Sequence, residues 1–315
     1  MTDVQTRCGF VALIGPTNAG KSTLLNCLVG AKLAIVTHKV QTTRARLRGI
    51  AVLGDAQIIF VDTPGIFKPQ RRLDRAMVQA AWGGADEADN IVLVIDAVRG
   101  LNVDAQTILD GLTKNQRKAV LVLNKIDLIR REDLLALVEK FDQSGLFTRM
   151  FMISASNGDG VEDLRRYLAG AVPRGPWLYP EDQLSDATER MMASEITREK
   201  LFLRVHQELP YDSTVETESW KEMKDGSARI DQTIYVRRDS QKPIILGKGG
   251  QTLKQIGEAA RHEMEKTFER RIHLFLHVKV NENGSMNPPV IAKWVWISAR
   301  IKVIRRLMVF AYGMG

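Results

Sequence analysis

Eight residues near the start of the chain restrict its fold more than any others, because they match the pattern G-x-x-x-x-G-K-[ST]. An apolar run at residues 9–14 precedes this octapeptide, and a segment with leucines at 24, 25 and 28 follows it. Strand, glycine-rich loop and helix come in this order where such a loop wraps a phosphate chain. The expected phosphate-binding residues are Gly15, Pro16, Thr17, Asn18, Ala19, Gly20, Lys21, Ser22 and Thr23.

Two side chains of the octapeptide supply a charge and a metal ligand. Lys21 stands where an ammonium group reaches the β- and γ-phosphates of a nucleotide, and the Ser22 hydroxyl stands where it ligates Mg²⁺. The glycines let consecutive backbone N–H groups turn toward the phosphates. The pattern therefore predicts a nucleoside triphosphate and Mg²⁺ as ligands, without naming the base.

A second loop is expected after the apolar run at residues 57–61. There Asp62 is placed to hold Mg²⁺ through water, and Gly65 brings a backbone N–H close to the γ-phosphate. A plain type II turn is the alternative, since Pro-Gly favours one. The loop is completed by Thr63, Pro64 and Ile66.

The base is indicated by residues that follow a third apolar run, at 119–123. Asp127 can accept hydrogen bonds from both N1–H and the N2 amino group of guanine, whereas adenine offers neither donor. Lys125 can lay its alkyl stem against the base. Farther on, the Ala155 N–H is expected to meet the base carbonyl, with Ser154 bracing the loop. GTP and GDP are thus the expected ligands. The expected base-binding residues are Asn124, Lys125, Ile126, Asp127, Ser154, Ala155 and Ser156.

Polar residues at 41–44 lie between the first two loops. We expect one threonine there, Thr43 in preference to Thr42, to ligate Mg²⁺ and to sense the γ-phosphate. Thr37 is a weaker candidate, and a solvated polar loop without a ligand is the alternative. Asp96, at the end of another apolar run, is interpreted as structural.

Together these segments resemble the translation-factor-related class of GTPases. The resemblance implies a doubly wound, mostly parallel α/β sheet with its nucleotide loops at the carboxyl ends of the strands. Ras-like enzymes have a glutamine after D-x-x-G that orients the attacking water. Ile66 occupies that position here and cannot hydrogen-bond water, so we expect slow hydrolysis. The expected catalytic residues are Lys21, Asn18, Thr42, Thr43 and Gly65.

Asn18 has two interpretations of equal weight. In related GTPases an asparagine at this position of the phosphate loop helps to hold K⁺ beside the phosphates, so the resemblance implies a possible K⁺ site. The alternative is an asparagine that only stabilises the loop.

The second half of the chain contains a G-x-x-G loop at residues 247–250. A helix is expected at 185–203 and strands at 214–223 and 228–237 before it, and a strand at 272–280 after it. The order α-β-β-α-α-β matches the type II KH fold, an α+β RNA-binding fold whose loop clamps a nucleic-acid backbone. A glycine-rich helix cap is the alternative. The expected RNA contacts are Ile245, Gly247, Lys248, Gly249, Gly250 and Lys254.

A GTPase domain followed by a type II KH domain resembles the Era family of bacterial ribosome-assembly GTPases, over roughly residues 5–283. The resemblance implies binding near the 3′ end of small-subunit ribosomal RNA and assembly of the small ribosomal subunit. We also expect the protein to act as a monomer. It also implies a cytoplasmic location with peripheral association with the inner membrane.

Two alternative functions stay open. One is an RNA-binding assembly chaperone that rarely hydrolyses GTP. The other is a tRNA-modifying GTPase, which has less support because no cysteine stands among the last residues. A tandem-GTPase assembly factor is excluded because the octapeptide pattern occurs once.

Charge and composition add few constraints. Of the net charge of +8, residues 284–315 supply five positive charges and no negative one, which leaves only +3 for the rest of the chain. Charge alone therefore does not indicate a nucleic-acid partner. No run approaches the roughly 18 apolar residues of a membrane span. Cys8 and Cys27 are typical of reduced thiols in a cytosolic protein.

We expect four segments along the chain: a GTPase domain at 1–175, a linker with the first helix at 176–199, a KH domain at 200–283 and an atypical tail at 284–315. The family resemblance implies a tryptophan and a charged helix where this tail is apolar and basic. A reading frame shifted by one nucleotide near Asn283 would restore that ending. We therefore expect a frameshift, genuine or a sequencing error, and a membrane-surface helix is the alternative.

Overall fold

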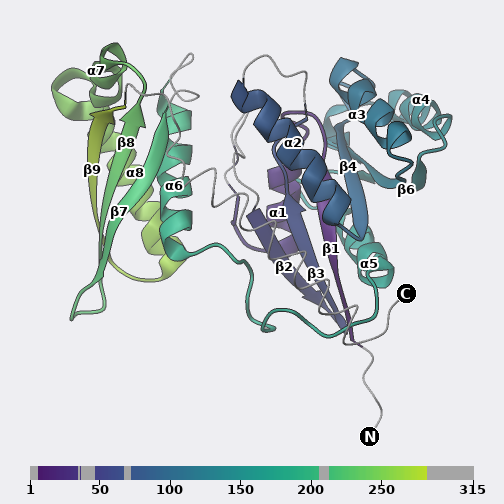
Figure 1. Cartoon of the computed structure of the whole chain (residues 1–315), viewed down its shortest axis with the longest axis horizontal. Helices are drawn as coiled ribbons and strands as arrows, with labels where there is room; N and C mark the ends of the chain where they lie inside the picture. The colour runs from purple at the N-terminus through teal and green to yellow at the C-terminus, as the bar shows by residue number, and fades with distance from the viewer. Residues whose placement is uncertain (1–5, 35, 37–46, 67–71, 206–212, 282–315) are drawn as a thin grey trace, which may run out of the picture.

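The computed structural model describes residues 6–34, 36, 47–66, 72–205 and 213–281, which form two units joined by one connecting segment (Figure 1). The first unit is a six-stranded sheet with helices on both faces, and the second is a three-stranded sheet with helices on one face. Among the described residues, no helix combines the length and the hydropathy that crossing a membrane requires.

The first unit alternates strands and helices along the chain. Its strand order is β2-β3-β1-β4-β5-β6, and every neighbouring pair is parallel except β2–β3. The apolar runs form its central strands because both faces of a parallel sheet are buried. The expected doubly wound α/β fold is confirmed. The elements are β1 (Arg7–Ile14), α1 (Lys21–Val29), β2 (Leu47–Leu53), β3 (Ala56–Asp62), α2 (Arg72–Glu87), β4 (Asn90–Asp96), α3 (Val103–Lys114), β5 (Ala119–Asn124), η1 (Ile126–Leu128), α4 (Arg131–Asp142), β6 (Phe147–Ile153) and α5 (Val161–Ala171).

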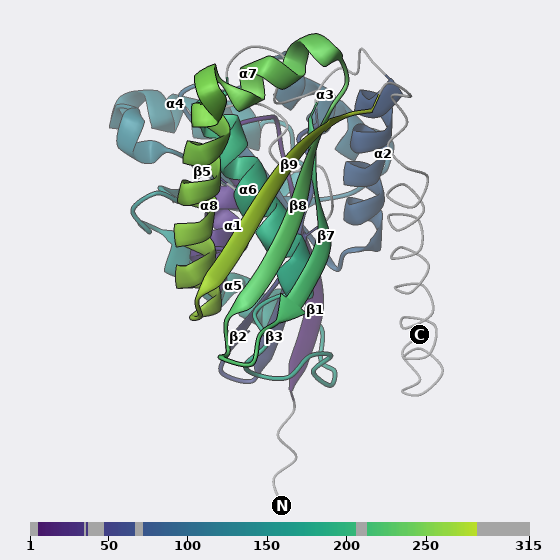
Figure 2. The ribbon, with the colours of Figure 1, turned by 90° about the vertical axis from the view of Figure 1, so that its left-hand side faces the viewer.

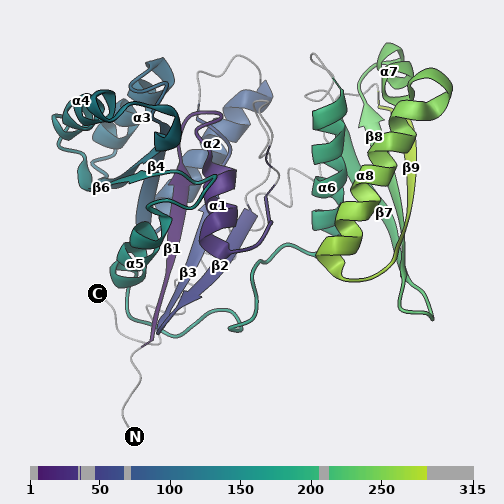
Figure 3. The same cartoon turned by 180° about the vertical axis from the view of Figure 1, so that it is seen from behind.

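Helices α1 and α5 cover one face of this sheet (Figure 3), and α2, α3 and α4 cover the other (Figure 1). Leu24 of α1 and Leu168 of α5 are fully buried on the first face, and Ile108 of α3 and Phe141 of α4 are fully buried on the second. The carboxyl ends of β1, β3 and β5 meet at one edge of the sheet. The three predicted nucleotide loops, which follow these strands, therefore converge there.

The second unit has the expected order α-β-β-α-α-β, which is confirmed. The central strand β8 pairs antiparallel with β7 and parallel with β9. Figure 2 shows this sheet toward the viewer, with α6 and α8 packed behind it. The elements are α6 (Glu189–Arg204), β7 (Thr214–Glu222), β8 (Ala228–Val236), η2 (Asp239–Gln241), α7 (Lys242–Leu246), η3 (Lys248–Gly250), α8 (Gln251–Phe268) and β9 (Ile272–Val280).

The first helix of this unit begins later than its sequence predicts. The Ser185 hydroxyl donates to the backbone oxygen of Arg48 at 2.8 Å, which holds that residue against the first unit. Thr188 caps the helix, because its hydroxyl accepts a backbone N–H at 3.3 Å. The helix then continues to Arg204, across the expected boundary between linker and KH domain. Since it packs on β7 and α8, the whole helix lies in the second unit.

The connecting segment is fastened to the first unit. Gln57 of β3 is fully buried and accepts the N–H groups of Leu178 and Tyr179 at 2.9 and 3.0 Å. Its side-chain nitrogen donates back to the Tyr179 oxygen at 2.8 Å. Farther along, the N–H of Ile50, in the edge strand β2, donates to the Leu184 oxygen at 2.8 Å. The connecting segment is therefore hydrogen-bonded to the sheet of the first unit at two places.

Candidate functional site

The phosphate loop joins β1 to α1, and its lysine lies inside it. Lys21 is 6% exposed, and its Nζ donates to the backbone oxygens of Gly15 at 3.0 Å and Pro16 at 2.8 Å. Burial lowers the pKa of Lys21 to about 8, although the charge of Asp62 acts in the opposite direction. An ammonium group held on loop carbonyls is positioned to exchange them for phosphate oxygens, which form stronger, charge-assisted hydrogen bonds.

Asn124, the last residue of β5, ties the phosphate loop to a distant loop. Its Nδ2 donates to the Ala19 oxygen at 2.9 Å, and its Oδ1 accepts the Ala155 N–H at 3.0 Å. Gly20 packs so closely that a Cβ there would lie 2.2 Å from Asn124 Nδ2. Three segments far apart in the sequence therefore meet at one amide. The Ala155 N–H, which we expected to meet the base carbonyl, donates to Asn124 in this arrangement.

Asp62 ends β3, fully buried beside the first turn of α1. The Ser22 hydroxyl donates to Asp62 Oδ2 at 3.0 Å. A hydroxyl and a carboxylate are hard oxygen ligands of the kind that Mg²⁺ prefers, so the pair fits the predicted metal site. Thr63 is also fully buried, and its hydroxyl donates to the Leu13 oxygen at 2.8 Å. Its side chain therefore fastens the loop to β1.

The D-x-x-G loop passes close to the phosphate loop. A Cβ on Gly65 would lie 2.7 Å from Thr17 Cγ2, and the Ile66 N–H donates to the Gly15 oxygen at 3.0 Å. The Ile66 side chain is 0% exposed and belongs to the same hydrophobic cluster as Ile14. Residue 66 is thus part of the core and does not contribute a side chain to the loop surface.

The loop after β5 carries the predicted guanine-binding residues. Lys125 has a φ of 68°, and its Nζ lies 2.7 Å from Oδ2 of Asp96, at the end of the neighbouring strand β4. Asp127 is exposed. In the loop after β6, Ser154 is buried, and its hydroxyl lies 2.9 Å from that of Ser156. Asp96, which we interpreted as structural, therefore contacts a predicted base-binding residue that sequence reasoning did not connect to it.

Part of the predicted site lies outside the described residues. Thr37, Thr42 and Thr43 all fall there, so their expected roles toward Mg²⁺ and the γ-phosphate stay predictions. Asn18 is described, half-buried and with a φ of 61°, a left-handed conformation in which asparagine is enriched. This conformation suits a loop-stabilising role and a K⁺-binding role equally.

The G-x-x-G loop lies between α7 and α8, with Gly247 at a φ of 70°. Lys248 and Lys254 are exposed beside it. The predicted RNA contact at Ile245 is wrong, because that side chain is 0% exposed in the core of the unit, whereas the neighbouring Ile244 is 56% exposed. Adjacent residues of a helix point about 100° apart, so Ile244 faces solvent where Ile245 faces the core.

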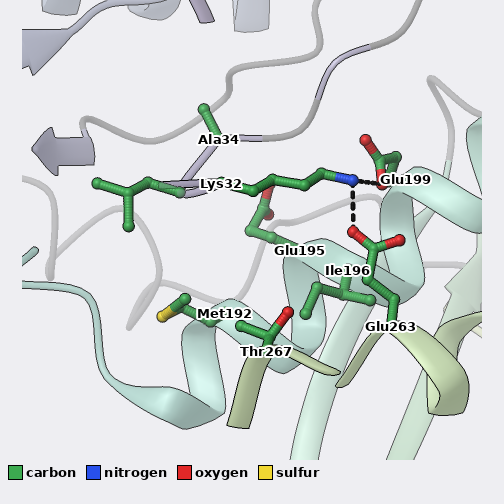
Figure 4. A pocket seen from close by; sticks show the side chains of 9 residues that line it. Lys32, Ala34, Met192, Glu195, Ile196, Glu199, Glu263 and Thr267 are labelled. Atoms are coloured by element: carbon green, nitrogen blue, oxygen red, sulfur yellow. Dashed lines mark hydrogen bonds and ion pairs between the residues drawn. The ribbon is translucent and has the colours of Figure 1, made fainter. Parts of the chain in front are cut away.

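A small pocket between the units contains residues that sequence reasoning missed (Figure 4). Lys32, after α1, pairs with both Glu199 of α6 and Glu263 of α8, and its Nζ lies 2.8 Å from Glu199 Oε2. Lys200 also pairs with both carboxylates, and Glu199 accepts the Val36 N–H at 3.0 Å. The partners of Lys32 lie 167 and 231 residues away in the sequence, so no local pattern indicates these pairs.

Comparison with protein families assigns each unit separately. A family model described as a 50S ribosome-binding GTPase matches residues 10–125. A KH domain model matches residues 208–285. The matches follow the two units of the structure and their order.

Curated relatives match the chain over most of its length. GTPase Era of Rhizobium meliloti is 63% identical over 285 residues, which cover 90% of this chain and 91% of the relative. GTPase Era of Brucella suis is 60% identical over 284 residues, which cover 90% of this chain and 91% of the relative.

Solved structures match across both units as well. An Era variant of Aquifex aeolicus bound to GDP and AlF4⁻ superposes with a TM-score of 0.84 at 37% identity, covering 88% of this chain and 94% of that one. Era in complex with MgGDPNP and nucleotides 1506–1542 of 16S ribosomal RNA superposes with a TM-score of 0.86 at 36% identity, covering 92% and 98%.

Proposed function

Because the chain belongs to the Era family of GTPases, we propose that its first unit binds GTP at the converging loops and its second unit binds the 3′ end of small-subunit ribosomal RNA. The protein is a GTPase, with GTP or GDP and Mg²⁺ as its ligands. In this proposal it serves as a slowly hydrolysing switch that assists assembly of the small ribosomal subunit. Its RNA partner is inferred from the relative solved with 16S ribosomal RNA.

The observation that carries the nucleotide proposal is the meeting of three loops at Asn124. Its side chain holds Ala19 of the phosphate loop and Ala155 of the last loop at 2.9 and 3.0 Å. A single amide therefore fixes the phosphate subsite relative to the base subsite. Lys125 and Asp127 follow it directly, so in this proposal the separation of the phosphate and base subsites is set before any ligand binds.

The phosphate subsite has little covalent chemistry to perform, since phosphoryl transfer depends on positioning and charge neutralisation. Lys21 supplies a buried positive charge for the β- and γ-phosphates. Ser22 and Asp62 would hold Mg²⁺, which neutralises charge on the same phosphates when bound. Gly65, lying against Thr17, leaves its backbone N–H free of side-chain obstruction near the γ-phosphate. Thr42 or Thr43 would complete the metal site.

Hydrolysis is slow in this proposal because residue 66 supplies no group to orient water. The buried Ile66 also favours a second function, an RNA-binding assembly chaperone in which GTP is bound and rarely hydrolysed. The two differ in one measurable quantity, phosphate release with and without RNA. A proposed K⁺ site at Asn18 adds a second comparison, since turnover should then fall when KCl is replaced by NaCl.

Nucleotide binding is tested by titrating the full chain with fluorescent GDP and with fluorescent ADP. We expect guanine selectivity of about 10⁴, because adenine would leave the Asp127 carboxylate without donors. Asp127→Asn should reduce this selectivity strongly while leaving melting behaviour intact, since Asp127 is exposed. Equal affinity of the unaltered chain for GDP and ADP would overturn the nucleotide assignment.

The RNA proposal is supported by the G-x-x-G loop and the two exposed lysines beside it. Lys248 and Lys254 would contact phosphates, while the backbone of Gly247, Gly249 and Gly250 allows a nucleic-acid strand to approach closely. Ile244, in place of the buried Ile245, would offer the apolar contact to a base. In this arrangement Lys248 and Lys254 would hold the RNA backbone, and Ile244 would contribute to recognition of a base.

RNA binding is tested with an oligonucleotide from the 3′ end of small-subunit ribosomal RNA. Replacing Lys248 and Gly249 by aspartate should reduce its affinity at least tenfold, because two acidic groups then face the phosphates. Lys266→Asp is a control for distant charge, since that exposed lysine lies near the other end of α8. Equal losses in both variants would indicate a general charge effect and contradict a specific clamp.

Three further assignments are proposals that rest on family membership and on the sequence. We propose a cytoplasmic protein, acting as a monomer, that associates peripherally with the cytoplasmic face of the inner membrane; cell fractionation tests the last point. We also propose domain limits at 1–175 and 200–283, apart from helix α6, which packs mainly on β7 and α8 and so belongs to the second unit. The proposed frameshift near Asn283 concerns residues outside those described, and resequencing of the gene tests it.

A further inference from the structure

Asp96 lies at the end of β4 with its carboxylate turned to the guanine loop. Its side chain is 9% exposed, and Oδ2 lies 2.7 Å from Nζ of Lys125. The other oxygen, Oδ1, accepts the Val98 N–H at 3.0 Å. The β4–β5 register pairs Asp96 with Asn124, so Lys125 is the next residue beyond the paired strands. One oxygen of the Asp96 carboxylate is thus held by the Val98 backbone, and the other contacts the Lys125 ammonium group.

The backbone of Lys125 is fixed independently of its side chain. The Ala97 N–H donates to the Asn124 oxygen at 2.8 Å, which joins the β4 and β5 loops just before the lysine. Lys125 then takes a φ of 68°, a left-handed conformation that is uncommon for a lysine. The backbone next to Lys125 and its ammonium group are therefore held by Ala97 and Asp96, at the end of β4, so both ends of the alkyl stem are positioned.

We propose that Asp96 is a positioning residue for the guanine base, because it orders the Lys125 stem as one wall of the base site before a nucleotide binds. This inference rests on the proposed function, since it requires a base beside Lys125. A free lysine side chain loses much rotamer freedom when a ligand orders it. When the ion pair forms during folding, the side-chain entropy of Lys125 is lost at that stage. Nucleotide binding then does not carry this entropic cost.

A purely stabilising role does not account for the pair as well. Lys125 is 32% exposed, so solvent screens part of the attraction, and a purely stabilising pair would change unfolding without changing nucleotide dissociation. Arg99 is a second cation near the carboxylate, at 4.0 Å, but it is 54% exposed and too distant for a strong hydrogen bond. The main consequence of the short Asp96–Lys125 contact is therefore orientation of the lysine.

The stem would contact the flat face of the base, whereas Asp127 reads its edge. The contribution of Asp96 should therefore be the same for guanine and for hypoxanthine, which lacks the N2 amino group. The contribution of Asp127 should differ between the two bases, because one of its two donors is missing in hypoxanthine. This difference separates a positioning role from edge recognition.

The test measures dissociation of GDP and of inosine diphosphate from Asp96→Asn, a variant of nearly unchanged shape. We expect both nucleotides to dissociate roughly tenfold faster, by the same factor, because an ion pair is replaced by a weaker hydrogen bond from the ammonium group to an uncharged amide. The effect on hydrolysis should fall on KM for GTP and not on kcat, since the base lies away from the reacting phosphate. Asp110→Asn, an exposed acid on α3, is the matched control.

A double-mutant cycle supplies the decisive comparison. Lys125→Met keeps the stem and removes the ammonium group, so it should raise dissociation to a similar extent, and Asp96→Asn should add nothing to it. Additive effects, or an unchanged dissociation rate in Asp96→Asn, would overturn the inference. If the unaltered chain bound neither GDP nor inosine diphosphate, the proposed function itself would fail. If Asp96→Asn folds poorly, an unchanged dissociation rate in Lys125→Met, which removes the same ion pair from the other side, would still overturn the inference.

Discussion

Lys32 of the first unit and Glu199 of the second form an ion pair across the interface between the units, with Nζ and Oε2 2.8 Å apart (Figure 4). The glutamate is 3% exposed, whereas the lysine is 47% exposed. Asn26 holds the lysine's segment in place, because its Oδ1 accepts the N–H groups of Leu33 and Ala34 at 2.9 and 2.8 Å. The pair therefore connects a braced loop of the GTPase unit to the first helix of the KH unit.

We expect Glu199→Gln to lower the free energy of unfolding by about 2 kcal/mol, because it leaves two lysines with one carboxylate in a mostly buried cluster. The exposure of Lys32 keeps the cost below that of a fully buried pair. Urea unfolding followed by circular dichroism measures the change. Glu258→Gln, at an exposed position on α8, should cost less than about 0.5 kcal/mol. Equal costs would contradict a special role for Glu199.

The contribution of the same cluster to folding stability should decrease in acidic solution. Burial by itself raises the pKa of Glu263, but hydrogen bonds from Lys200 and Lys32 outweigh it and hold the pKa below the ordinary 4.5. A carboxyl group with a lowered pKa stabilises the fold above its unfolded pKa, and this contribution is lost as the pH falls through the folded value. The effect of the cluster should therefore be complete above about pH 4.5 and disappear in more acidic solution.

Lys21 leads to a prediction about nucleotide binding and pH. Its pKa falls from 10.5 to about 8 through burial, so a neutral Lys21 becomes populated in mildly alkaline solution. Phosphates favour the charged form, and binding should then take up protons in mildly alkaline solution and far fewer in acidic solution. GDP affinity should accordingly weaken as the pH rises above 8.

Calorimetric titration in two buffers of different ionisation enthalpy measures this uptake. Lys21→Met keeps most of the stem and should bind weakly, with no difference between the buffers at pH 8. Observed heats that are identical in both buffers for the unaltered chain would contradict the lowered pKa of Lys21.

The sequence predicted those parts of the molecule that depend on local pattern. The octapeptide, the apolar runs and the G-x-x-G loop each determine their own strand, loop or helix, and the order of elements follows from them. Contacts between distant segments could not be predicted, as the Lys32–Glu199 pair and the bonds of Gln57 to the connecting segment show. Asp96 was identified as the end of a strand, but its partner depended on the register of β4 with β5.

Ile66→Gln tests whether slow hydrolysis results from the chemistry of residue 66 or from its place in the fold. Because that side chain is 0% exposed among apolar neighbours, a glutamine there would bury an amide and would not reach the attacking water. We expect no increase in kcat and a loss of about 1–3 kcal/mol in the free energy of unfolding. Single-turnover phosphate release measures the first quantity. A clear acceleration would show that the loop turns residue 66 outward when GTP binds.

Two consecutive isoleucines provide a matched pair of variants for the proposed apolar contact to RNA. Ile244→Ala removes a side chain that is 56% exposed, so the free energy of unfolding should change by less than about 0.5 kcal/mol while RNA affinity falls severalfold. Ile245→Ala removes one that is 0% exposed, so it should lower the free energy of unfolding by about 2–5 kcal/mol. Thermal melting and binding of the ribosomal RNA oligonucleotide measure the two effects. If Ile244→Ala destabilised the unit and Ile245→Ala affected only RNA binding, the sequence-based contact at Ile245 would be right and the burial of that residue in the KH core would be wrong.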